Sequence, residues 1–214
     1  MDDESALREL ICEIGRRLWQ LGMVAANDGN ISVRLDDGTI LCTSAGISKG
    51  FMAPASIAKL SMDGEALGDT EASSEVAMHL EAYRVRADVN AVVHAHPPVA
   101  TGYATSGRSL PVKILAETVT AFREVPVAEY ATPGTQEVVI AVRPHLANHD
   151  ALLLMNHGAL TLGRDLEQAY FRMEILEHFA KTALVVAQLG SAQEIPPEQL
   201  EQLYALRRKL GYEH

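Results

Sequence analysis

The chain has few cysteines, few aromatic residues and a deficit of positive charge. Neither of its two cysteines, Cys12 and Cys42, lies in a CxxC motif or beside a histidine cluster, so both are expected to be buried thiols without a redox role. The 18 lysines and arginines are outnumbered by 28 aspartates and glutamates, which gives a formal net charge of -10. Nucleic acids and anionic membranes bind basic faces, so the composition argues against both partners.

Long hydrophobic runs are also missing. No apolar stretch approaches the roughly 20 residues that cross a bilayer, and the acidic start MDDESALREL lacks the basic and then apolar segments of a signal peptide. We therefore expect a cytoplasmic protein. With 48% hydrophobic and 21% charged residues, the composition is that of a globular chain, and no linker or low-complexity stretch divides it, which predicts a single domain over residues 1–214.

Hydrophobic periodicity predicts that helices and strands alternate along the chain. Helices are expected at about 4–23, 73–86 and 165–190 and after the two prolines at 196–197, with Ser73 and Asp165 as N-caps and Gly190 as a stop. Strands are expected at 31–35, 39–44, 57–62, 89–96, 125–130 and 151–157, the first two joined by a turn at 36–38. This order predicts a mixed α/β fold with one central sheet flanked by helices.

Two histidines at the end of a predicted strand are the first sign of chemistry. In AVVHAHPP, residues 91–98, His94 and His96 are separated by one residue, so their side chains project from the same face of the strand. Two imidazoles make an incomplete metal site. Taken alone, the pair is equally compatible with one histidine capping the strand and the other lying in a solvated turn.

A third histidine and a glutamate complete a candidate ligand set. In LLLMNHGAL an apolar strand ends on His157, and Gly158 then allows the chain to turn closely around it. Glu75 lies in the first turn of the predicted helix 73–86, where it either binds a metal or simply stabilises the helix. Three histidines and a carboxylate suit Zn²⁺ or a similar divalent ion. His79, four residues after Glu75 on the same helical face, is an alternative metal ligand, but it is expected instead to contact one of the ligand residues or to pack in the core.

Small residues in three segments indicate a place for an anion. Gly29 and Asn30 precede a strand in NDGNIS, Gly46 lies at a turn in TSAG, and Ser73 and Ser74 stand at a predicted helix start. Exposed backbone N–H groups at such turns and helix starts bind phosphate. Each segment alone is typical of an ordinary turn, but Ser74 is adjacent to the candidate ligand Glu75.

In order, GNIS, TSAG, SSE, HAHPP and NHG resemble the class II aldolase/adducin family, and most closely its fuculose-1-phosphate aldolase branch. The resemblance covers nearly the whole chain. It implies a three-layer α/β/α subunit with a single central, mostly antiparallel sheet, a homotetramer with active sites at subunit interfaces, and a divalent metal, usually Zn²⁺, with Mn²⁺ an alternative. The residues that correspond to the metal ligands are His94, His96, His157 and Glu75. The residues at phosphate-binding positions are Gly29, Asn30, Ala45, Gly46, Ser73 and Ser74.

The same resemblance implies an activity. A ketose 1-phosphate would be cleaved reversibly to dihydroxyacetone phosphate and an aldehyde through an enediolate that the metal stabilises as a Lewis acid. Glu75 would serve as the acid and base that protonates, or deprotonates, the enediolate carbon.

The sequence departs from the fuculose enzyme at three positions. Ala45 stands where the fuculose enzyme has a phosphate-binding hydroxyl, which the adjacent Ser44 is a candidate to replace. Leu115 stands at the position of one active-site tyrosine of that enzyme, and Leu210 stands near the position of a second. Those tyrosines act on the part of the substrate that becomes the aldehyde, so the sequence does not predict which aldehyde is released. Two other activities of the family also stay open, a sugar-phosphate 4-epimerase and a 3-oxo-sugar-acid-phosphate decarboxylase. A different class of function is a non-catalytic, adducin-like interaction module.

Overall fold

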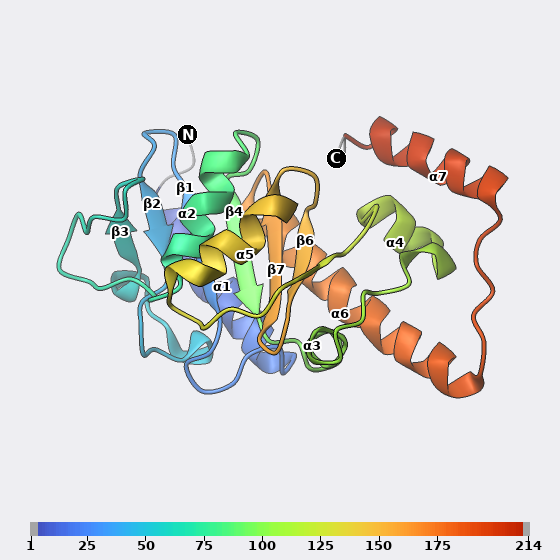
Figure 1. Ribbon diagram of the computed structural model, residues 1–214. Coiled ribbons are helices and arrows are strands. Elements are labelled where there is room, and N and C mark those ends of the chain that lie inside the picture. The colour runs from blue at the N-terminus through green and yellow to red at the C-terminus, as the bar shows by residue number, and fades with distance from the viewer. Residues whose placement is uncertain (1–3, 212–214) are drawn as a thin grey trace.

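The computed structural model describes residues 4–211 (Figure 1). In chain order the elements are α1 (Glu4–Gln20), β1 (Asn30–Arg34), β2 (Ile40–Cys42), η1 (Lys49–Phe51), η2 (Pro54–Ser56), β3 (Ala58–Leu60), α2 (Val76–Val85), β4 (Ala91–Ala95), α3 (Pro98–Thr105), η3 (Val112–Ile114), α4 (Ala116–Ala121), β5 (Val127–Ala128), α5 (Gln136–Leu146), β6 (Ala151–Leu154), β7 (Gly158–Gly163), α6 (Leu166–Leu189) and α7 (Pro197–Lys209). The three η elements are short 3-10 helices. No helix in the described part of the chain is both long and apolar enough to span a membrane.

The strands form one seven-stranded sheet in the order β3-β2-β1-β4-β7-β6-β5. Every neighbouring pair is antiparallel except β5 and β6, which run parallel. This arrangement confirms the expected single, mostly antiparallel sheet. The central strand β4 carries His94, which lies opposite Asn30 on β1 and Leu160 on β7. The middle of the sheet therefore brings motifs that are distant in sequence to one place.

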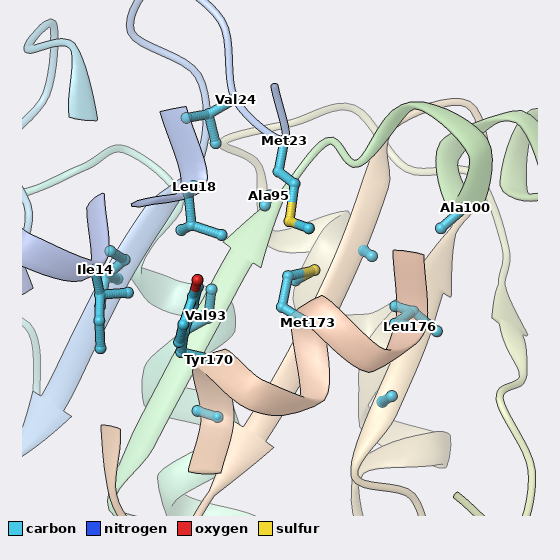
Figure 2. Packing of buried hydrophobic residues seen from close by; sticks show 14 of the residues in the cluster. Ile14, Leu18, Met23, Val24, Val93, Ala95, Ala100, Tyr170, Met173 and Leu176 are labelled. Atoms are coloured by element: carbon cyan, nitrogen blue, oxygen red, sulfur yellow. The ribbon is translucent and has the colours of Figure 1, made fainter. Parts of the chain in front are cut away.

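Helices cover both faces of the sheet, which confirms the three-layer α/β/α architecture (Figure 1). Because alternate residues of a strand face opposite sides, β4 divides its side chains between two cores. Val93 and Ala95 pack against α1, α3 and α6, whereas Val92 packs on the side of α2 and α5. Figure 2 shows Val93 among side chains of α1 and α6, including Leu18 and Tyr170. These residues are almost fully buried, which anchors the central strand rigidly.

The two predicted boundaries of the long helix are confirmed. The Asp165 carboxylate accepts a hydrogen bond from the Gln168 backbone N–H at 2.7 Å, and Gly190 follows the last residue with a φ of 121°. The predicted Ser73 N-cap is wrong, because α2 begins at Val76 and Glu75 occupies the cap position. The Ser73 backbone N–H instead donates to the Thr43 carbonyl oxygen, which ties this segment to the residue after β2.

Several elements were not expected from the sequence. Helices α3, α4 and α5 lie in stretches for which no element was predicted, and α5 contains Pro144 in its interior. The predicted strand 151–157 ends at Leu154, and the chain reverses through a turn into β7. Asn156 supplies that turn with a positive φ of 55°, a conformation that asparagine tolerates better than most residues. As a result, His157 lies in a hairpin turn rather than in a strand.

Candidate metal centre and substrate cleft

Three histidines converge at one end of the central strands. His94 is on β4, His96 lies just beyond its end, and His157 is in the turn between β6 and β7. One ring nitrogen of each lies within 4.8 Å of those of the other two. The Nε2 atoms of His94 and His96 are 3.1 Å apart. Such a concentration of imidazole nitrogens is the arrangement that a divalent metal ion requires.

Hydrogen bonding orients the two histidines from β4. The Nδ1–H of His94 donates to the Ala159 carbonyl oxygen at 2.9 Å, which leaves the lone pair of Nε2 directed at the cluster. Nδ1 of His96 lies 3.5 Å from a carboxylate oxygen of Asp28, so its Nε2 also faces the cluster. Burial lowers the pKa of His94 to about 3, against the opposing charge of Glu75. Burial and the charge of His157 lower the pKa of His96. Neutral imidazoles are the form that binds metal.

The predicted role of Gly158 in a close approach is confirmed. A Cβ added at this position would lie 2.5 Å from the Ala95 carbonyl oxygen and 2.6 Å from Cδ2 of His96. Both distances are shorter than real Cβ contacts, so any side chain here would push β7 away from the end of β4. Glycine therefore allows His157 to approach His94 and His96, with ring centroids 4.7 Å and 5.1 Å away respectively.

Glu75 faces the histidine cluster from the start of α2. Its Oε1 lies 3.2 Å from Nε2 of His157, and its Oε2 lies 3.4 Å from Nε2 of His94. Asn30 donates a hydrogen bond from Nδ2 to Oε2 at 2.9 Å. Burial alone would raise the pKa of Glu75, but His157, His94 and Asn30 outweigh it and hold the pKa well below its usual range.

The donor set fits a zinc-like ion. Within residues 4–211, the buried Oε1 of Glu75 has no hydrogen-bond donor that meets ordinary geometry. It adds a carboxylate oxygen to three imidazole nitrogens, and nitrogen and carboxylate donors in this number are typical of Zn²⁺ sites.

A cleft of about 350 Å³ adjoins this cluster. Its walls include every residue predicted to bind an anion, namely Gly29, Asn30, Ala45, Gly46, Ser73 and Ser74, together with Glu75, His96 and His157. Gly29 has a φ of 71°, and a Cβ there would lie 2.8 Å from the His94 carbonyl oxygen. The glycine thus keeps the backbone of this loop directly against β4, the strand that carries His94.

Residues 9–184 match the family described as the Class II Aldolase and Adducin N-terminal domain. The chain belongs to this family. It is 30% identical over 200 residues to the 5-deoxy-D-ribulose 1-phosphate aldolase of Bacillus thuringiensis, covering 92% of each chain. It is 32% identical over 189 residues to the 3-oxo-tetronate 4-phosphate decarboxylase of Escherichia coli K12, covering 86% of this chain and 88% of that one.

The fold agrees with solved structures of the family. An L-fuculose 1-phosphate aldolase superposes with a TM-score of 0.87 at 28% identity, covering 95% of each chain. Class II aldolases use divalent metals, and the histidine cluster is a place where this member of the family could bind one.

The three departures from the family pattern have different surroundings. Ala45 lines the cleft, but the adjacent Ser44 donates its hydroxyl proton to the Ser56 carbonyl oxygen, so this proton is not directed at a ligand. Leu115 precedes α4 and lines a separate apolar groove. Leu210 follows α7 with 52% of its surface exposed. Neither leucine lines the cleft beside Glu75 within the chain.

Two residues of the site escaped the sequence interpretation. Asp28 lies beside His96, and Lys49 is buried in the cleft wall. Asp28 is part of the NDGNIS motif and could have been considered, because histidine ligands commonly have a carboxylate partner. The burial of Lys49 could not be predicted from the sequence, since a lysine after a turn is ordinarily solvated.

A buried group of polar side chains lies along α2 next to Glu75. Glu75 at the N-cap of α2 and His79 and Tyr83 within the helix are spaced four residues apart, opposite Asn30 and Ser32 of β1. The Ser32 hydroxyl contacts Nδ1 of His79 at 2.7 Å and the Tyr83 hydroxyl at 2.6 Å. His79 is fully buried, as the expectation of a packed histidine requires. Burial lowers its pKa to about 4.

This depressed pKa predicts a pH-dependent stability. Between pH 6.5 and pH 4 His79 is protonated in the unfolded chain but not in the folded chain, so protons stabilise the unfolded state. The stability that depends on neutral His79 is therefore fully present above pH 6.5 and is lost as the pH falls toward 4. Relative to wild type, we expect His79→Gln to lose about 2 kcal/mol less stability between pH 7 and pH 5. Urea unfolding of both proteins at the two pH values measures this difference. Equal losses would contradict it.

Proposed function

We propose that the protein is a divalent-metal-dependent aldolase that reversibly cleaves a ketose 1-phosphate to dihydroxyacetone phosphate and an aldehyde. The observation that carries the proposal is the convergence of three imidazoles and one carboxylate beside a cleft formed by glycine- and serine-rich turns, with Glu75, His96 and His157 in its wall. Relatives that act on 5-deoxy-D-ribulose 1-phosphate and L-fuculose 1-phosphate support this choice of substrate class.

We assign separate roles in metal binding and phosphate binding to the residues of the site. His94, His96, His157 and Glu75 would hold Zn²⁺ or Mn²⁺, and the bound cation would supply Lewis-acid stabilisation of the enediolate oxygen. Gly46 and Ser74 would bind the phosphate through their backbone N–H groups, and Ser73 and Ser74 would contribute their hydroxyls. Because these residues line the same cleft as Glu75, His96 and His157, the phosphate would lie beside the cluster.

Glu75 is the proposed acid and base. In cleavage its carboxyl would deliver a proton to the enediolate carbon, and in condensation its carboxylate would remove the same proton. Asn30 donates to Oε2 and so limits the rotation of the carboxylate. With its pKa held low at rest, Glu75 would become a useful base when substrate changes its surroundings.

A decarboxylase of a 3-oxo-sugar-acid phosphate is the second candidate, because the Escherichia coli relative has comparable identity and coverage. That reaction and the 4-epimerase reaction would use the same cleft. An adducin-like interaction module is disfavoured, since burying several imidazoles and a carboxylate together is costly unless they bind an ion.

We also propose a homotetramer with active sites at subunit interfaces, as the family resemblance implies. The support is an exposed apolar patch at the α1–η1 edge. Trp19 and Phe51 lie in ring contact at 5.4 Å and are 41% and 74% exposed. A subunit interface would cover such a patch.

Metal analysis coupled to an activity assay tests the proposed function. We expect about one Zn²⁺ or Mn²⁺ per subunit and release of dihydroxyacetone phosphate from fuculose-, ribulose- or 5-deoxyribulose-1-phosphate. Chelation should abolish release, and adding the metal back should restore it. Bound metal with carbon dioxide or an epimer as product would replace the aldolase by the alternative reactions. Protein without metal would favour the interaction module.

A further inference from the structure

Lys49 is a buried cation in the wall of the proposed phosphate cleft. The residue is only 2% exposed, at the start of η1. Among the described residues that line the cleft it is the one lysine or arginine, whereas Asp28 and Glu75 contribute carboxylates. The cleft also belongs to a chain with a net charge of -10. A phosphate that enters it would therefore be favoured by a positive charge from the protein itself, in addition to that of the proposed metal ion.

The ammonium group joins the two loops that carry the candidate anion-binding glycines. Nζ donates to the Asn27 carbonyl oxygen at 2.9 Å and to the Ile47 carbonyl oxygen at 2.8 Å. Asn27 is two residues before Gly29, and Ile47 directly follows Gly46. An ammonium has three N–H donors, so these bonds use two of them.

No carboxylate within residues 4–211 forms an ion pair with Lys49 at 4.0 Å or less. Burial lowers the pKa of this lysine, and the more distant charges of Asp28 and Glu75 oppose that effect. Keeping an ammonium buried on two carbonyl oxygens alone is costly. Methionine would fill the same space without this cost, so the position has a reason to carry charge.

We propose that Lys49 is the charge that selects phosphorylated ligands in this cleft. It would attract the phosphate and hold the loops of Gly29 and Gly46 at the spacing that the phosphate needs. The inference rests on the proposed function, because it takes the cleft as the phosphate site. It adds a specificity-determining residue outside the glycine and serine positions.

Calorimetric titration of the metal-loaded protein with inorganic phosphate, and separately with dihydroxyacetone, tests the assignment. We expect Lys49→Met to weaken phosphate binding by about tenfold or more, with dihydroxyacetone binding unchanged. Lys49→Arg should retain most phosphate affinity. The matched control is Lys181→Met, an exposed lysine on α6 that lines a different groove. Phosphate affinity that is unchanged in Lys49→Met would overturn the proposal.

A second variant covers the case in which Lys49→Met does not fold. Asp28 has an exposed side chain and opposes an incoming anion, so Asp28→Asn should tighten phosphate binding by about threefold. Unchanged or weaker binding would count against an electrostatic role for this cleft. The proposed function is tested separately on the wild-type protein, by its metal content and its release of dihydroxyacetone phosphate. An active wild type that binds no phosphate in this titration would overturn the role of Lys49 alone.

Discussion

Replacing Glu75 with glutamine is expected to lower kcat by about 100- to 10,000-fold, the contribution typical of a positioned acid and base. Glutamine preserves the size of the side chain and can still accept the hydrogen bond that Asn30 donates at 2.9 Å. It cannot accept or deliver the proton. The three histidines remain, so metal should still bind, and rates are compared at saturating metal to separate proton transfer from metal affinity.

The control for this variant is Glu117→Gln. Glu117 is an exposed glutamate in the first turn of α4 and does not line the cleft. Its substitution should leave kcat within about twofold of wild type. Steady-state cleavage assays, with metal content measured on the same samples, decide the outcome. Full activity in metal-saturated Glu75→Gln would remove this residue from the mechanism and leave it as a ligand alone.

The histidine cluster was predictable because its signals are local. Period-two alternation places His94 and His96 on one side of β4, and the apolar run before His157 indicates a strand that ends at the same edge of the sheet. Antiparallel pairing of β4 with β7 then brings His157 close, with Ala95 opposite Ala159. Local pattern and sheet geometry agree here, so the sequence predicted which side chains converge, and their role as metal ligands stays a prediction.

Other features depend on tertiary contacts that no local pattern reports. Ser73 is a residue type typical of an N-cap, but its backbone N–H donates to the Thr43 carbonyl oxygen, which holds this segment beside β2. Helix α2 therefore begins at Val76, with Glu75 in the cap position. Lys49 is buried by the loops that its own ammonium joins. Pro144 weakens the helical signal of α5, although the helix packs on α2. In each case packing overrides local preference.

The largest stability effect is expected at Asp150, the residue directly before β6. Its side chain is 2% exposed and accepts hydrogen bonds from Arg86 at 3.1 Å, Arg172 at 2.7 Å and Arg207 at 3.1 Å. These arginines come from the end of α2, from α6 and from α7. One carboxylate therefore connects the sheet to helices on both faces and to the C-terminal helix.

Substituting Asp150 with alanine should destabilise the protein by about 3–5 kcal/mol, because three buried guanidinium groups lose the carboxylate they share. Asp88→Ala is the matched control, since Asp88 also contacts Arg86 but has a side chain that is 55% exposed. An ion pair with one exposed partner is worth about 1 kcal/mol or less. Urea unfolding of the two variants at pH 7 measures both costs. A loss in Asp150→Ala no larger than that in Asp88→Ala would mean that the arginines find other partners or water, and that the cluster does not hold the three helices to the sheet.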